Sequence, residues 1–166
     1  MSEQATPRVK VRPARAHELL ELRHRVLRAG FGREEASFDG DDDPRTRHFV
    51  AVDHDDAVVG CASIMPDSYG GKPSWRLRGM AIEEGWRSRG VGAELLRVID
   101  AFVASDSSLA APQLWCNART PAVEFYKRNG WVVVSDEFVI ETAGPHFKMT
   151  RTVPSIGRSK ADEAHG

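Results

Sequence analysis

Residues 77–93 read LRGMAIEEGWRSRGVGA, and this stretch decides the fold. It opens with a β-rich apolar run, Leu77 to Ile82, which predicts a strand. From Val91 onward, apolar residues recur at three- and four-residue intervals, which predicts an amphipathic helix beginning at Gly90 and Gly92. A strand, a glycine-containing turn and a helix in this order form a candidate anion site, because the first helical N–H groups are unpaired and the helix dipole is positive there.

The glycines of this turn are a weak signal by themselves, since a tight turn from a strand into a helix uses them without any ligand. Other phosphate motifs fit worse. No third glycine follows Gly92 three residues later, as a dinucleotide fingerprint requires, and no Lys-Ser/Thr pair follows as in a P-loop. Nucleotide hydrolysis and hydride transfer are therefore disfavoured, and the neighbouring elements have to decide what the turn binds.

The sequence before this stretch predicts a strand, a helix and a β-meander. Val9 to Arg12 alternates like a short strand, and Ala16 to Arg28 has the apolar spacing of a helix. Ala29 to Arg47 is rich in Gly, Asp, Glu and Arg, which predicts either a functional loop or a short second helix. A predicted antiparallel hairpin follows, with strands at His48 to Val52 and Ala57 to Met65, a turn at Asp53 to Asp56, and a further turn region at Pro66 to Ser74.

The sequence after the helix predicts a strand, a second helix and a strand-turn-strand ending. Gln113 to Asn117 is a short apolar strand that ends at Asn117. Thr120-Pro121 resembles an N-cap followed by proline at the first helical position, and Asn129-Gly130 should end that helix. The predicted ending has strands at Trp131 to Val134, Phe138 to Ile140 and His146 to Met149, with a turn at Gly144-Pro145.

Length and composition bound the class of protein. A chain of 166 residues is long enough for one core and too short for two comfortable domains, so we expect one domain over residues 1–153. Residues 154–166 have little to bury, and we expect a disordered tail. The net charge of −1 and the scattered basic residues disfavour nucleic-acid binding, and no apolar run is long enough to span a membrane. A polar N-terminus, with Cys61 and Cys116 in strand-like runs, fits a reducing cytoplasm.

Four features in order give the sequence a specific resemblance. These are the Leu77 to Ile82 strand, the Arg-x-x-Gly-x-Gly turn that starts at Arg87, Phe125-Tyr126 within a helix, and Gly130-Trp131 at its exit. Together they resemble the GNAT N-acetyltransferases, closely over about residues 75–134 and loosely elsewhere. The resemblance implies an α/β fold of three layers, in which a mixed and mostly antiparallel sheet has splayed central strands flanked by helices.

The resemblance also implies roles for individual residues, with acetyl-CoA as co-substrate. Backbone at Met80 to Ile82 would pair with the pantetheine arm, Asn117 would contact that arm, and Tyr126 would protonate the departing sulfur. A phenol can do so at modest cost, because its pKa of roughly 10 lies near the roughly 8.5 of a thiol. Asn117 could instead cap a helix, and Tyr126 could simply pack in one. The pyrophosphate would bind at Arg87, Ser88, Arg89, Gly90, Val91, Gly92 and Ala93, and the cofactor arm at Met80, Ala81 and Ile82.

The acceptor is expected to be a primary amine of a small molecule or peptide, and the protein a monomer or homodimer. An alkylammonium has no free lone pair, so a base or a water chain must take its proton. Glu83, Glu84, His48, His146 and the acidic run Asp39 to Asp43 stay open as candidates. We favour a solvated loop for the acidic run over attraction of a cationic acceptor. Its spacing lacks the calcium-loop pattern, so no metal is expected.

Two alternatives to this activity stay open. One is a non-catalytic domain that binds or senses acyl-CoA with the same fold. The other is an acetyltransferase that acts on protein side chains or on a hydroxyl. The sequence does not choose among acceptors, and the acceptor pocket is expected from Ala16 to Arg47 and the C-terminal hairpin.

Overall fold

The computed structural model describes residues 8–106 and 112–154, which form two compact units. Unit 1 comprises the described residues up to Met65 together with Leu77–Val98. Unit 2 comprises Pro66–Arg76 together with the described residues from Ile99 onward. A single domain over residues 1–153 stays a prediction. The predicted tail from Ser155 onward lies outside the described residues.

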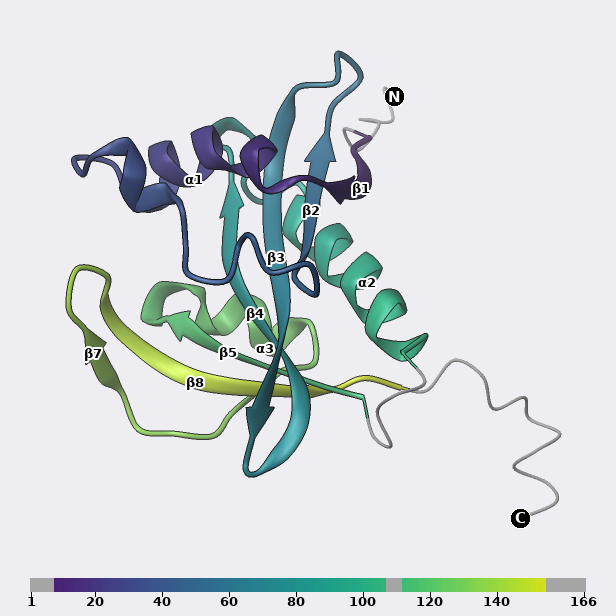
Figure 1. Ribbon diagram of the computed structural model, residues 1–166, viewed down its shortest axis with the longest axis vertical. Coiled ribbons are helices and arrows are strands. Elements are labelled where there is room, and N and C mark those ends of the chain that lie inside the picture. The colour runs from purple at the N-terminus through teal and green to yellow at the C-terminus, as the bar shows by residue number, and fades with distance from the viewer. Residues whose placement is uncertain (1–7, 107–111, 155–166) are drawn as a thin grey trace, which may run out of the picture. The chain divides into compact units, whose positions relative to one another are not determined.

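The strands pair in the order β1-β2-β3-β4-β5-β8-β6, and β7 pairs with β8 (Figure 1). The β4–β5 pair is parallel, whereas β1–β2, β2–β3, β5–β8, β6–β8 and β7–β8 are antiparallel. The sheet is therefore mixed and mostly antiparallel, as predicted. The strands are β1 (Lys10–Ala14), β2 (Arg47–Val52), β3 (Val58–Tyr69), β4 (Lys72–Ile82), β5 (Gln113–Arg119), β6 (Val132–Val133), β7 (Phe138–Ile140) and β8 (Gly144–Thr152).

In the described residues, three α-helices and four short 3₁₀ helices complete the fold. None of the helices in the described part of the chain is long and apolar enough to cross a membrane. The helices are α1 (Leu20–Leu27), α2 (Val91–Ala104), α3 (Val123–Arg128), η1 (Ala16–Leu19), η2 (Arg33–Ala36), η3 (Glu84–Trp86) and η4 (Thr120–Ala122).

In unit 1, the apolar side of η1 and α1 packs against β2 and β3 (Figure 1). Leu19 and Leu22 are buried together with Val50, Val52 and Cys61. The helical spacing of the leucines and the alternation of the valines predict these two faces, and burial of such side chains is worth about 1.5–3 kcal/mol each. The N-terminal strand, helix and hairpin are thus confirmed, and η2 supplies the short helix in the loop.

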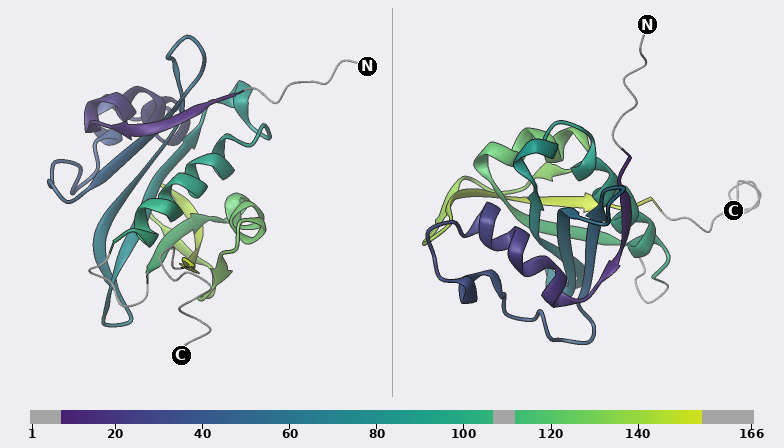
Figure 2. Two further views of the ribbon diagram at one scale, coloured as in Figure 1. Left: turned by 90° about the vertical axis from the view of Figure 1, so that its right-hand side faces the viewer. Right: turned by 90° about the horizontal axis from the view of Figure 1, so that it is seen from above.

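In unit 2, α3 packs against β5 and β6 (Figure 2). The ring of Tyr126 makes edge contacts with Phe125 and with Trp131, each at 5.2 Å between centroids. The helix ends as predicted, because Gly130 adopts a φ of 89° and Trp131 N–H donates to the Tyr126 carbonyl.

Three predicted boundaries were wrong. The turn region at 66–74 is a hairpin instead, since β3 continues to Tyr69 and β4 starts at Lys72 around the left-handed Gly70-Gly71. Thr120 is not the helix cap, because its hydroxyl donates to Glu137 at 2.9 Å and the N-cap residue of η4 is Arg119. The predicted turn at Gly144-Pro145 already belongs to β8. In the first and third cases, strand pairing continues up to or through the residues that gave the turn signal.

Both cysteines are expected to resist thiol reagents in the native protein. Cys61 and Cys116 are free and buried, and burial raises the pKa of each thiol to about 12. The thiolate is the reactive form, so it is nearly absent at mildly alkaline pH. We expect no alkylation by iodoacetamide until denaturant is added, followed by labelling of both residues, as counted by mass spectrometry. Rapid labelling of the native chain would contradict the burial.

Candidate active site

The turn before α2 has the backbone of an anion-binding site. Ser88 and Gly90 both adopt left-handed conformations, with φ values of 61° and 84°. Such alternation folds successive N–H groups into a concave arrangement. The N–H of Glu94 donates to the Gly90 carbonyl at 3.0 Å and closes the first turn of the helix. Helix geometry therefore leaves the N–H groups of the preceding turn without intrahelical acceptors.

The surroundings of this turn are open and basic. A Cβ placed on Gly90 would meet nothing within 4 Å, so the space beside the backbone is free for a ligand group. Arg87 and Arg89 are exposed, and the Arg89 guanidinium lies 5.6 Å from the centroid of Trp86. Trp86 is the most exposed of the four tryptophans. Backbone, space and charge thus all suit an anionic group such as a pyrophosphate.

Gly60 positions the start of α2, and sequence reasoning missed it. A Cβ on Gly60 in β3 would lie 2.8 Å from Val91 and 3.1 Å from Leu95, both on the buried side of α2. Only glycine allows the helix to approach this close. An isolated glycine inside a strand pattern was the available signal.

The strand before the turn carries a second such glycine. Gly79 in β4 has a φ of 69°, and a Cβ there would lie 3.0 Å from Arg23 Nε and 3.2 Å from Phe38. The left-handed residue interrupts the regular pleat of β4 immediately before Met80 to Ile82. Ala81 of that segment is buried, and Met80 and Ile82 are half-buried. The predicted cofactor-pairing segment therefore begins at an irregular point of the strand.

Tyr126 lies in the interior of unit 2. It is 6% exposed, and its pKa is raised well above 10, first by burial and then by the neighbouring Cys116. The phenol therefore keeps its proton throughout the physiological range. This environment suits a neutral hydrogen-bond donor and makes full proton transfer costlier than the sequence argument assumed.

Asn117 is inside β5 and not at its end, because the strand continues to Arg119. It is no helix cap either, since the N-cap residue of η4 is Arg119. Its Oδ1 is buried without a hydrogen-bond partner. Neighbouring residues of a strand point to opposite faces, so Asn117 lies on the face away from Cys116 and Tyr126. The two predicted site residues of unit 2 are thus not brought together.

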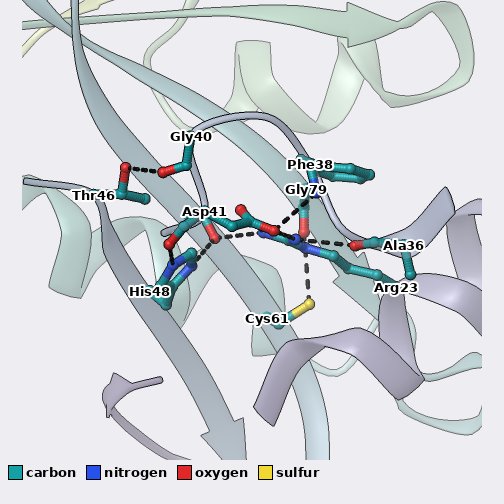
Figure 3. Close-up of polar contacts among 10 residues, drawn as sticks. Arg23, Ala36, Phe38, Gly40, Asp41, Thr46, His48, Cys61 and Gly79 are labelled. Carbon is teal, nitrogen blue, oxygen red and sulfur yellow. Dashed lines mark hydrogen bonds and ion pairs between the residues drawn. The ribbon is translucent and has the colours of Figure 1, made fainter. Parts of the chain in front are cut away.

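A buried ion pair anchors the acidic loop of unit 1 (Figure 3). Arg23 donates to both carboxylate oxygens of Asp41, at 2.6 and 3.2 Å, and also to the Ala36 carbonyl and the Ser63 hydroxyl. The Arg23 side chain is fully buried, and its guanidinium lies 4.2 Å from the Phe38 ring centroid. Part of the acidic run is therefore internal, which corrects the prediction of a wholly solvated loop.

The same network removes His48 as a general base. Its Nε2 lies 3.0 Å from the Asp41 carbonyl oxygen, which only accepts, so Nε2 carries the proton. Its Nδ1, 2.6 Å from Ser63 Oγ, then accepts from that hydroxyl. Both nitrogens are engaged, and the residue is buried. His48 has no lone pair free for an acceptor amine.

The remaining base candidates differ in their availability. Glu83 is ion-paired with Arg25, and Asp43 with Arg45, which lowers the pKa of Asp43 to about 2. His146 is buried and its Nδ1–H donates to the Gly144 carbonyl at 2.7 Å, which leaves the lone pair of a neutral ring on Nε2. Glu84, Asp39 and Asp42 are exposed. Within residues 8–106 and 112–154, no group of three His, Cys, Asp or Glu side chains is placed to hold a metal ion.

The fold and the basic helix start define an α/β protein with a candidate anion site, and sequence comparison gives the family. Residues 44–133 match the Acetyltransferase (GNAT) domain family, which covers more than half of the chain. The chain therefore belongs to the GNAT acetyltransferases, as the resemblance implied.

Relatives in Bacillus subtilis (strain 168) support the same assignment. The chain is 29% identical to the uncharacterized N-acetyltransferase YitI over 151 residues, which span 87% of this chain and 97% of YitI. It is 28% identical to the uncharacterized N-acetyltransferase YjcF over 106 residues, spanning 64% and 70% of the two chains. The protein is thus an N-acetyltransferase by family.

Solved structures show the same fold. An aminoglycoside 6'-N-acetyltransferase complexed with coenzyme A superposes with a TM-score of 0.68 at 18% identity, covering 90% of this chain and 99% of that one. The GNAT family N-acetyltransferase YhbS from Escherichia coli, in complex with CoA, gives 0.67 at 17% identity, covering 93% and 86%. Identities this low support the fold alone.

Proposed function

We propose that the protein transfers an acetyl group from acetyl-CoA to a primary amine of a small molecule or peptide. The observation that carries this proposal is the start of α2, where open space, unpaired N–H groups and two exposed arginines lie together. Two structural neighbours were solved with coenzyme A, which makes an acyl-CoA the natural anionic ligand for this turn.

In this proposal, backbone N–H groups from Arg89 to Ala93 bind the pyrophosphate, and Arg87 and Arg89 add positive charge. The backbone of Met80 to Ile82 pairs with the pantetheine arm. The unpartnered Oδ1 of Asn117 is an acceptor for an amide N–H of the ligand. Acetyl-CoA supplies the activated acyl group when bound.

The reaction is a direct attack, in which the amine nitrogen forms a bond to the acetyl carbonyl carbon and the carbon–sulfur bond breaks. Tyr126 donates a hydrogen bond to the sulfur as negative charge develops there. The ammonium form of the acceptor first loses its surplus proton to a base or to water, and the proton that leaves nitrogen as the amide forms passes to the coenzyme A thiolate directly or through water. Positioning of the two reactants supplies much of the rate, since it makes the encounter effectively unimolecular.

Calorimetric titration with acetyl-CoA, with NADH and ATP as controls, tests the cofactor first. We expect selective binding of acetyl-CoA, and we expect Gly90→Glu to weaken its Kd at least about tenfold. The new carboxylate would face the pyrophosphate, and a side chain at a left-handed φ of 84° costs roughly 1–2 kcal/mol.

Gly85→Glu is the matched control. It adds the same charge five residues earlier, where a Cβ also meets nothing within 4 Å and no left-handed φ is involved. Equal weakening by both variants would argue against a specific pyrophosphate site. Failure of the wild-type protein to bind acetyl-CoA would overturn the proposed function. Binding without turnover across a broad amine panel would favour the non-catalytic acyl-CoA-binding alternative.

A further inference from the structure

One face of the unit 2 sheet carries a tryptophan between two cations. In the parallel β4–β5 pair, Arg76 is the partner of Trp115, and in the β5–β8 pair Lys148 is the partner of Asn117. Cross-strand partners share a face, as do residues two apart on one strand, so these four side chains lie on the same face. The Arg76 guanidinium lies 4.8 Å and the Lys148 ammonium 5.1 Å from the Trp115 ring centroid.

Neither Arg76 nor Lys148 takes part in a salt bridge within the described part of the chain. The other ionisable residues at this face of β5 and β8 are Arg119 and His146, which are also basic. Asp67 belongs to the same unit, but its Oδ1 accepts from the Ser68 backbone N–H. Arg76 and Lys148 therefore give the surroundings of Trp115 a positive potential.

Two of its hydrogen-bond donors are buried and unpaired. Trp115 is 8% exposed, and its Nε1 has no acceptor. The Nε of Arg76 is likewise buried without a partner. A buried donor without an acceptor costs about 1–3 kcal/mol, so two on neighbouring side chains call for an explanation. A ligand with acceptor oxygens would satisfy both.

We propose that Arg76, Trp115 and Lys148 bind the carboxylate of the acyl acceptor, so that the acceptor class is an amino carboxylate such as an amino acid or short peptide. The three groups offer donors only, and a carboxylate offers acceptors only. A guanidinium stacked on an indole keeps its N–H edge free for a planar anion. This inference rests on the proposed function, because it names the substrate class of that reaction.

The indole N–H resonance of Trp115 tests binding without requiring turnover. It is identified among the four tryptophan signals by its loss in Trp115→Phe. The full chain is titrated with glycine, L-phenylalanine, L-glutamate and glycyl-phenylalanine, and with the carboxamide of each. We expect a saturable shift with at least one free acid and none with its carboxamide. Absence of a saturable shift with all four acids would overturn the proposal, whether or not acetyl-CoA binds.

Kinetics and matched variants separate this site from the cofactor site. For an acid that is a substrate, Arg76→Gln should raise KM about tenfold, with kcat and the Kd of acetyl-CoA nearly unchanged. Lys148→Gln should act in the same direction. Lys127→Gln is the control, because Lys127 is an exposed lysine of the same unit, paired with Glu124 at 3.4 Å. Equal use of acid and carboxamide, or a preference that survives Arg76→Gln, would refute the assignment.

Discussion

Asp41→Ala is expected to lower the free energy of unfolding by about 3–5 kcal/mol at neutral pH. The carboxylate is nearly inaccessible, and it is the partner of an Arg23 guanidinium that has no solvent exposure. After the substitution, Arg23 would keep only the Ala36 carbonyl and the Ser63 hydroxyl as acceptors. A buried charge without a counter-ion costs more than the pair contributed, and urea unfolding would measure the loss.

The same substitution should remove a pH dependence of stability. Burial acts most strongly on the Asp41 carboxyl and raises its pKa, but hydrogen bonds from Arg23 and the Phe38 N–H, with the Arg23 charge, outweigh it. The pKa in the folded protein therefore lies below the ordinary 3.8. Because the folded value is the lower one, this contribution is present above about pH 4 and is lost as the pH falls further. The deficit of Asp41→Ala should accordingly shrink in acid.

Two further variants identify the cause. Asp43→Ala removes a half-buried carboxylate, paired with the exposed Arg45, from the same acidic run and should change stability little. The double variant Arg23→Met/Asp41→Leu should recover much of the loss, because it leaves no charge buried. If Asp41→Ala proved no more harmful than Asp43→Ala, the ion pair would not be anchoring this loop.

The Arg23–Asp41 pair also shows what the sequence could and could not predict. Arg23 lies on the apolar side of α1, one residue after Leu22. A charged residue is unusual at such a position, and this can be recognised from the sequence. Its partner is 18 residues away in the acidic run, and nothing in the local sequence distinguishes Asp41 from the neighbouring aspartates. Long-range pairing therefore decided which acid is buried.

The fold was predictable where periodicity is strong. The change from a strand pattern at 77–82 to a helical pattern from Val91 predicted the end of β4 at Ile82 and the start of α2 at Val91, whereas β4 starts five residues earlier than predicted, at Lys72. The long β3–β4 hairpin was missed, because Pro66 and Gly70-Gly71 gave a strong turn signal, whereas pairing continues to both sides of the glycines. Local propensity yields to cross-strand pairing in such cases.

The residues of the candidate site likewise differ in whether the sequence could predict them. The glycine turn at 88–92 was predictable because its function depends on local backbone conformation. Gly60, which allows α2 to approach β3, was not, since its importance depends on Val91 more than thirty positions away. The charge and unpaired donors around Trp115 likewise come from three strands that only the fold brings together.

Tyr126→Phe is expected to lower kcat for acetyl transfer about 100-fold, with the Kd of acetyl-CoA unchanged. The substitution removes a single hydroxyl and keeps the ring that packs edge-on against Phe125 and Trp131. The lost group acts on sulfur charge that exists only as the bond breaks, so ground-state binding should not change. Tyr69→Phe, the same change at the other tyrosine of the chain, is the control.

The pH profile distinguishes a hydrogen-bond donor from a full proton donor. Burial holds the Tyr126 pKa well above 10, whereas a free thiol has a pKa of about 8.5. Complete transfer of the proton to the leaving sulfur would therefore be uphill, so Tyr126 should remain protonated and donate a hydrogen bond to it. Ionisation of Tyr126 should then cause no loss of kcat up to about pH 10. An alkaline decline of the wild-type kcat with an apparent pKa of about 8–9, absent from Tyr126→Phe, would contradict this role.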